Sequence, residues 1–124
     1  MKIILVSPDL MAASQIMRAV EAVNGKFRQV GTVAGAVECL NEDNSESGDA
    51  DHHVVLLDLS SKGTEVADSV TTLRQVAKPP TIIAYAPHVH VERLDAAREA
   101  GCDYVLSRGQ VYRELADLLQ QLPA

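Results

Sequence analysis

The chain contains 124 residues, of which 47% are hydrophobic and 23% are charged, and this composition is typical of a globular protein with one domain. The formal net charge of −6 argues against nucleic acid as a partner, because a phosphate backbone attracts proteins with an excess of basic residues. Two cysteines are too few for a disulfide framework or a zinc site, so we expect reduced thiols and a cytoplasmic location.

The first predicted elements are a short strand and a helix. Residues 3–6 form an apolar run that predicts a buried strand and is too short to cross a membrane, so we expect no membrane partner. Apolar residues at helical spacing follow on one face, at Ala13, Ile16, Met17, Val20 and Val23. Pro8 and Asp9 suit the start of this helix, and Asn24-Gly25 ends it.

The next segment predicts a weaker strand and a short helix. Polar residues interrupt the strand pattern of residues 27–33, which places this strand at the edge of the sheet. Residues 34–40 predict a helix. The segment 41–51 contains five acidic residues and no basic one, and we expect a solvated surface loop there.

The clearest buried strand spans residues 54–57 and ends at Asp58. An apolar stripe at helical spacing follows it, at Val66, Val70, Leu73 and Val76. Residues 81–86 predict a fourth strand, which Pro87 ends because proline cannot donate a hydrogen bond to the sheet.

A helix and a final strand and helix complete the pattern. Residues 91–100 predict a helix that Gly101 ends, and residues 103–107 predict a fifth strand. The last helix has an apolar face at Val111, Leu115, Leu118, Leu119 and Leu122. Apolar strands that alternate with amphipathic helices predict a parallel sheet covered on both faces. Right-handed connections then favour a doubly wound three-layer α/β sandwich. We expect residues 1–124 to form this one domain.

Ligands of such folds bind at the carboxyl ends of the strands, which selects a small set of candidate site residues. These are Ser7, Pro8 and Asp9 after the first strand, Asp58 after the third, Tyr85 and Ala86 after the fourth, and Ser107 and Arg108 after the fifth. No glycine-rich loop follows any predicted strand, which excludes the usual dinucleotide and P-loop sites.

Residues 54–59 (VVLLDL) and residues 99–104 (EAGCDY) resemble two parts of the response-regulator receiver domain, the phosphoacceptor module of two-component signalling. The resemblance extends over nearly the whole chain in the order and separation of its elements. It implies a flavodoxin-like fold with the strand order 2-1-3-4-5 and no enzyme activity. It also implies that Asp58 is the phosphoacceptor or its relic, phosphorylated in the family by a histidine kinase with Mg²⁺ bound.

Other positions of the receiver site differ from the family pattern. The family holds Mg²⁺ with an acidic pair, where this chain has Ser7 and Pro8. For Asp9, which comes next, we favour the role of a helix cap, and the alternative is a substitute metal ligand together with Asp58. Tyr85 stands where the family has a small hydroxyl residue, and its phenol extends too far to replace that hydroxyl.

The lysine that follows the fifth strand in the family has two candidate equivalents. Counting from Gly101 gives Arg108, whereas alignment on Tyr104 as the family's mobile aromatic residue gives Ser107. The two registers direct opposite side chains into the site, because side chains alternate along a strand. We favour Arg108, which retains the positive charge.

These departures predict a pseudo-receiver that acts through protein contacts and has no cofactor beyond weakly bound Mg²⁺. Its partner face, by analogy with receivers, includes Tyr104, Arg108 and Tyr112. The expected partner is a histidine kinase or a downstream signalling protein, and a homodimer is a further candidate. The alternative is a working receiver phosphorylated on Asp58, with Asp9 as a metal ligand. A small-molecule binder that reuses the vacated pocket is the third hypothesis.

Overall fold

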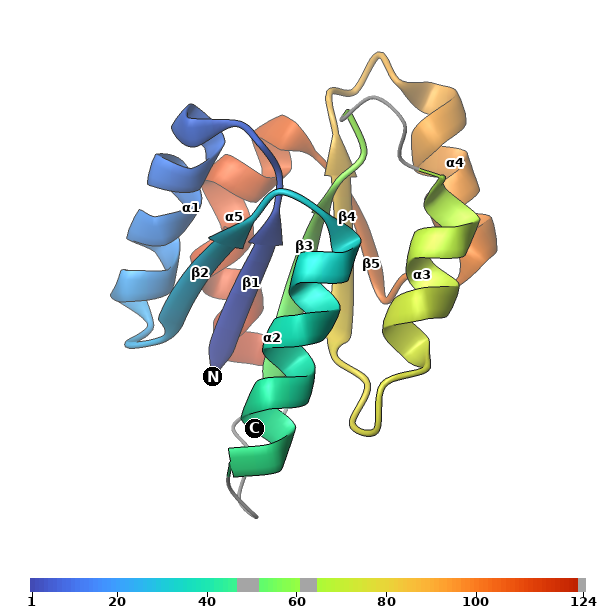
Figure 1. Cartoon of the computed structure of the whole chain (residues 1–124). Coiled ribbons are helices and arrows are strands. Elements are labelled where there is room, and N and C mark those ends of the chain that lie inside the picture. Colours follow the sequence, from blue (N-terminus) through green and yellow to red (C-terminus); the bar gives the residue numbers. More distant parts are fainter. Residues whose placement is uncertain (47–51, 61–64, 123–124) are drawn as a thin grey trace.

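Five parallel strands form one sheet between two layers of helices in the computed structural model, which describes residues 1–46, 52–60 and 65–122 (Figure 1). The strands are β1 (Lys2–Val6), β2 (Lys26–Val30), β3 (His53–Asp58), β4 (Thr81–Ala86) and β5 (Tyr104–Ser107). The helices are α1 (Leu10–Ala22), α2 (Val33–Glu46), α3 (Val66–Arg74), α4 (Val91–Ala100) and α5 (Arg108–Gln121). The strand order is β2-β1-β3-β4-β5, which confirms the predicted doubly wound α/β fold.

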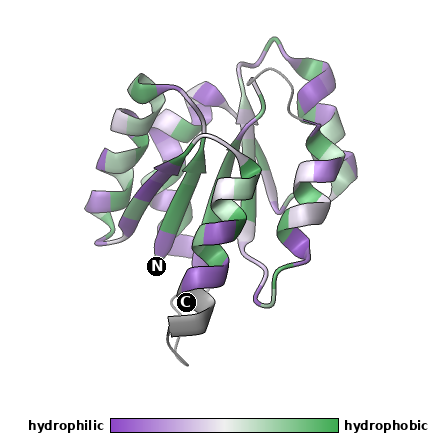
Figure 2. Cartoon of the chain, viewed as in Figure 1, coloured by the Kyte–Doolittle hydropathy of each residue, from purple (hydrophilic) through white to green (hydrophobic). Residues whose placement is uncertain are grey.

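The central strand β3 supplies side chains to both layers of the core. Its successive side chains point to opposite faces of the sheet, so Val54 and Leu56 pack with α1 and α5, whereas Val55 and Leu57 pack with α2, α3 and α4. All six residues of β3 are buried. Figure 2 shows hydrophobic residues along the inner strands and hydrophilic ones on β2, the edge strand that the sequence predicted.

Two predictions about the helices were wrong in detail. Met17 is exposed, and Ala12 takes its place in the buried stripe of α1, because the contact with the sheet follows residues 12, 13, 16 and 20. Helix α2 continues through Glu46, so residues 41–46 are helical rather than a loop. These residues include no glycine or proline that would end a helix. The rest of the predicted acidic loop, residues 47–51, lies outside the described part of the chain.

None of the helices within the described ranges combines the length and the apolar character that a membrane span requires.

Helix α4 ends at Gly101, as predicted, with this residue in the left-handed conformation (φ +90°). The Gly101 and Cys102 amides donate to the carbonyl oxygens of Arg98 and Ala97, which closes the last turn. A Cβ atom at Gly101 would meet no other atom within 4 Å, so backbone strain alone opposes a side chain there.

We expect Gly101→Ala to lower the free energy of unfolding by about 1–2 kcal/mol, the cost of the left-handed conformation for a residue with a Cβ atom. Gly31→Ala is the matched control, because Gly31 has equal space around it and no positive φ. Urea unfolding of both variants measures the difference. Equal stability of the two variants would contradict the assignment of strain to Gly101.

Candidate functional site around Asp58

The strand register places Asp58 among the residues that end the neighbouring strands. Val6 of β1 pairs with Leu57 of β3, so Ser7 comes directly beside Asp58. On the other side, Tyr85 of β4 is in register with Asp58. Because the strands are parallel, these residues meet at the carboxyl edge of the sheet, the edge that binds ligands in this class of fold.

Hydrogen bonds from the protein occupy both oxygens of the Asp58 carboxylate. Ser7 Oγ donates to Asp58 Oδ2 at 2.7 Å, and the residue Ser7 is only 1% exposed. Ser60 donates twice to Asp58 Oδ1, from its backbone N–H at 2.9 Å and from its hydroxyl at 2.6 Å. Asp58 is only 3% exposed, so these donors replace the water that a free carboxylate would bind.

Asp9 uses its carboxylate to cap α1. Its Oδ1 atom accepts hydrogen bonds from the backbone N–H groups of Met11 at 2.9 Å and Ala12 at 3.2 Å, which confirms the predicted capping role. Its own N–H donates to Ser7 Oγ at 3.1 Å. The neighbouring Pro8 is exposed and has no side-chain oxygen or nitrogen.

The donor set around Asp58 does not fit a Mg²⁺ site of the receiver type. Mg²⁺ in proteins requires oxygen ligands in octahedral geometry, usually with one or two carboxylates. Here the Asp58 oxygens already accept hydrogen bonds and the Asp9 carboxylate is engaged by α1. Among the residues that the structure describes, no group of three or more His, Cys, Asp or Glu side chains could hold a metal ion.

Tyr85 fills the space on the α1 and α5 side of the sheet, next to the carboxylate. It is fully buried, and its hydroxyl forms no hydrogen bond of acceptable geometry with the described residues. Burial raises the pKa of the Tyr85 phenol above its ordinary value, and the negative charge of Asp58 raises this pKa further. The nearby Ser7 hydroxyl and the positive charge of Arg108 lower it by less.

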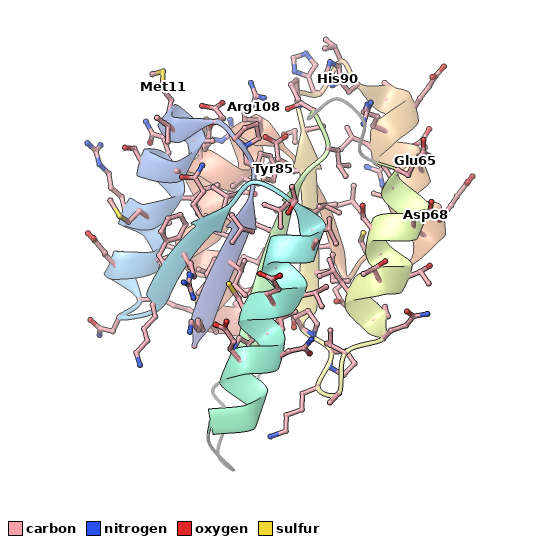
Figure 3. The ribbon with its side chains drawn as sticks, in the orientation of Figure 1. Met11, Glu65, Asp68, Tyr85, His90 and Arg108 are labelled. Carbon is pink, nitrogen blue, oxygen red and sulfur yellow. The ribbon has the colours of Figure 1, made fainter. Side chains whose placement is uncertain are left out.

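Arg108, not Ser107, extends toward the Asp58 site. Ser107 caps α5, since its Oγ accepts from the Gln110 N–H at 3.2 Å and its N–H donates to Gln110 Oε1 at 2.8 Å. Arg108 Nη2 donates to Ser60 Oγ at 3.4 Å, and its Nε atom is buried with no hydrogen-bond partner in the described part of the chain. Figure 3 shows Arg108 and Tyr85 at the same end of the molecule.

The remaining candidate residues make no hydrogen bond to the Asp58 carboxylate in the described structure. Ala86 is fully buried and packs in the cluster on the opposite side of the sheet, with α2, α3 and α4. Tyr104 lines a groove of about 280 Å³ between β5 and α5, together with Leu106 and Leu118. Tyr112 is 41% exposed, and its phenol lies close enough to Asp9, Asp58 and Arg108 for their charges to shift its pKa. Tyr112 thus lies near Arg108, whereas Tyr104 lies beside the C-terminal half of α5.

Sequence reasoning did not identify two residues that support the site. Ser60 follows Asp58 at the spacing of an Asx turn, in which a carboxylate accepts from the N–H two residues later, and this spacing could have identified it. Gln29 on β2 donates from Nε2 to the Ser7 carbonyl oxygen at 2.8 Å. No local pattern could have identified Gln29, because the contact depends on how β2 pairs with β1.

Solved structures similar to this chain are response-regulator receiver domains. The signal receiver domain of a response regulator from Bermanella marisrubri has 24% sequence identity and a TM-score of 0.77, with 98% of this chain and 96% of that chain covered. A response regulator receiver domain from Rhodospirillum rubrum has 15% identity and a TM-score of 0.76, with 100% and 96% covered. The Mn²⁺-bound form of the response regulator Rcp1 has 12% identity and a TM-score of 0.72, with 99% of each chain covered.

No family model matches the sequence, and no curated protein matches it.

We expect Ser7→Ala to lower the free energy of unfolding by about 1–3 kcal/mol, because Asp58 Oδ2 would lose its donor while it remains buried. Ser14→Ala, at an exposed serine on α1, is the control and should change stability by less than about 0.5 kcal/mol. Urea unfolding at neutral pH measures both changes. Equal stability of the two variants would contradict a stabilising Ser7–Asp58 hydrogen bond.

The buried phenol of Tyr85 makes stability sensitive to alkaline pH. In the unfolded chain a tyrosine loses its proton near pH ~10, whereas the raised pKa keeps folded Tyr85 protonated to higher pH. The contribution of the neutral Tyr85 phenol to the free energy of unfolding is complete below pH ~10. It is lost as the pH rises, by up to about 1.4 kcal/mol per pH unit.

Tyr85→Phe removes the phenol hydroxyl that titrates. The stability of this variant should therefore fall less steeply above pH ~10 than that of the wild type. Cys102, whose pKa burial raises to about 11, is present in both proteins and cancels in the comparison. Urea midpoints between pH ~8 and ~11.5 provide the measurement. Parallel curves for the two proteins would contradict the burial of a neutral Tyr85 phenol.

The fold, the position of Asp58 at the end of β3 and the agreement with solved structures lead to one conclusion: the chain has the fold of response-regulator receiver domains.

Proposed function

We propose that this chain is a receiver-like signalling domain of a two-component system and that it acts through contacts with other proteins. In this proposal it is a cytoplasmic pseudo-receiver, not an enzyme, and it forms little or no Mg²⁺-dependent acyl phosphate on Asp58. The shared fold supports the assignment to two-component signalling. The altered site supports the pseudo-receiver assignment.

The observation that carries the proposal is the engagement of the Asp58 carboxylate by three donors of the protein itself. A carboxylate attacks phosphorus with an oxygen lone pair, and hydrogen bonds to that oxygen stabilise the carboxylate and lower its nucleophilicity. Here Oδ1 accepts two hydrogen bonds from Ser60 and Oδ2 accepts one from Ser7. Asp58 would have to break part of this network before it could attack.

The residues after β1 provide the second support. A bound Mg²⁺ ion would offset the charge of a phosphoryl group near Asp58, and its usual acidic ligands are replaced by Ser7 and Pro8. Ser7 instead donates a hydrogen bond to the Asp58 carboxylate, and Asp9 stabilises the first turn of α1. Both residues therefore have structural roles that compete with metal binding.

The groove between β5 and α5 provides a surface for a protein partner. Its apolar lining includes Tyr104 and Leu118, and Glu114 and Asp117 of α5 add negative charge. A partner segment with apolar and basic side chains would complement this lining. Two copies of the chain joined through this groove would bring their acidic residues together, so we favour a different protein, such as a histidine kinase or a downstream component.

The alternative function is a working receiver with Asp58 as the phosphoacceptor. Arg108 favours it, because this cation extends to the Asp58 site from the start of α5, where receivers have a lysine. The Mn²⁺-bound form of the similar protein Rcp1 shows that a receiver of this fold can bind a divalent cation.

Phosphorylation in vitro distinguishes these two functions. The wild type and Asp58→Asn are incubated with acetyl phosphate and Mg²⁺, and the intact protein is weighed before and after hydroxylamine, which cleaves acyl phosphates. We expect no hydroxylamine-sensitive gain of mass in either protein, and no change in tyrosine fluorescence when Mg²⁺ is added.

A phosphoryl gain in the wild type that hydroxylamine removes and that is absent in Asp58→Asn would establish Asp58 as the phosphoacceptor and contradict the pseudo-receiver proposal.

A further inference from the structure

A second nucleophile lies beside Asp58, the hydroxyl group of Ser60. We propose that Ser60 is a phosphoryl-acceptor site, with Asp58 as its general base and Arg108 as the ligand of the transferred group. This inference rests on the proposed function, because it requires Asp58 to accept hydrogen bonds rather than to attack phosphorus itself.

The contact between Ser60 and Asp58 has the geometry of a hydroxyl nucleophile and its base. Ser60 Oγ lies 2.6 Å from Asp58 Oδ1, which is a short hydrogen bond to a carboxylate. Ser7 holds the other carboxylate oxygen, so the base is oriented by a third group. A carboxylate accepts a hydroxyl proton in the same way in protein kinases, where an aspartate contacts the substrate hydroxyl.

The orientation of Arg108 is the observation that points to a transferred oxyanion. The N–H bonds of Nε and Nη2 lie parallel on one edge of a guanidinium group, which matches two acceptor oxygens. In Arg108 the Nη2 atom touches Ser60 Oγ at 3.4 Å, whereas the buried Nε atom has no acceptor among the residues that the structure describes. A phosphoryl group on Ser60 Oγ would supply the missing acceptor and would receive both N–H donors.

The Asx turn alone does not account for this arrangement. The turn needs only the Ser60 backbone N–H, which donates to Asp58 Oδ1 at 2.9 Å. It requires neither the Ser60 hydroxyl nor an arginine from α5 with an unfilled donor. The backbone before Ser60 is also held in place, because Arg93 Nη1 donates to the Leu59 carbonyl oxygen at 2.7 Å. Asp58 and Arg108 therefore both position the Ser60 hydroxyl. Ser60 is only partly buried, so a phosphoryl donor in solution can reach it.

The reaction transfers one phosphoryl group from an activated donor, an acyl phosphate or a phosphoramidate. An oxygen lone pair of Ser60 Oγ forms the new O–P bond as the P–N bond of an N-protonated phosphoramidate breaks, and the electron pair of that bond leaves with the nitrogen as neutral ammonia. The Ser60 proton passes to Asp58 Oδ1 and then to water, and ammonia is released. The product is a phosphate ester, which is stable to hydroxylamine, unlike an acyl phosphate on Asp58.

The test uses potassium phosphoramidate as the donor and the intact mass of the full chain as the readout. We expect the wild type to gain one phosphoryl group that survives hydroxylamine and that peptide mapping locates on Ser60. Ser60→Ala should gain none, whereas Ser60→Thr should retain the reaction because it keeps a hydroxyl. Circular dichroism confirms that each variant is folded, and Ser60→Thr keeps the test decisive if Ser60→Ala does not fold.

Variants of the other two residues separate their roles. Asp58→Asn should lower the initial rate about a hundredfold, because the amide cannot accept the hydroxyl proton as a base. Arg108→Lys should lower it about tenfold, because lysine keeps the charge but lacks the parallel pair of N–H donors. Ser14→Ala removes an exposed hydroxyl on α1 and should react like the wild type.

Two results would overturn the inference, and they differ in what they say about the proposed function. If no protein gains a phosphoryl group, Ser60 is not an acceptor and the pseudo-receiver proposal stands. If Ser60→Ala still gains a group that hydroxylamine removes and that peptide mapping locates on Asp58 rather than on one of the four histidines, Asp58 is the acceptor and both proposals fail.

Discussion

The buried carboxylate of Asp58 imposes the constraint on which this edge of the sheet depends. An ionised carboxylate removed from water must accept hydrogen bonds from the protein, and only segments that end at the same edge can provide them. Ser7 after β1 and Ser60 after β3 supply the donors. The same requirement places Ser60 within reach of Arg108, the first residue of α5. One charged group thus links three segments that are far apart in the chain.

Two polar groups near this carboxylate lack the partners that buried groups usually have. The Tyr85 hydroxyl and Arg108 Nε are both buried and without a hydrogen bond among the described residues. Each such group costs about 1–3 kcal/mol, so the protein gives up stability at the edge where receivers carry out their chemistry. Native proteins accept costs of this kind mainly at functional sites. The unsatisfied groups of Tyr85 and Arg108 therefore agree with the proposal that this edge is functional.

The strands and most helices could be predicted because their signals are local. The apolar run before Asp58 and the pattern of residues 81–86 identify buried strands, and Gly101 ends α4 as its position predicts. The strand order came from the resemblance to receivers, since no local pattern specifies which strands pair. The end of α2 was predicted too early because acidic residues are compatible with a helix as well as with a loop.

By itself, the sequence determined the alternation of strands and helices and placed Asp58 at the carboxyl end of a buried strand, because both follow from local periodicity. The rule that ligands bind at the carboxyl ends of strands selected Ser7, Tyr85 and Arg108 as candidates, but only the tertiary structure decided which residues contact Asp58. It placed Arg108 near the site and Ser107 in a helix cap, and it brought in Ser60. The contacts of Asp58 with Ser7 and of Ser60 with Arg108 join residues 51 and 48 positions apart. Such contacts arise from the packing of parallel strands, which no local pattern encodes.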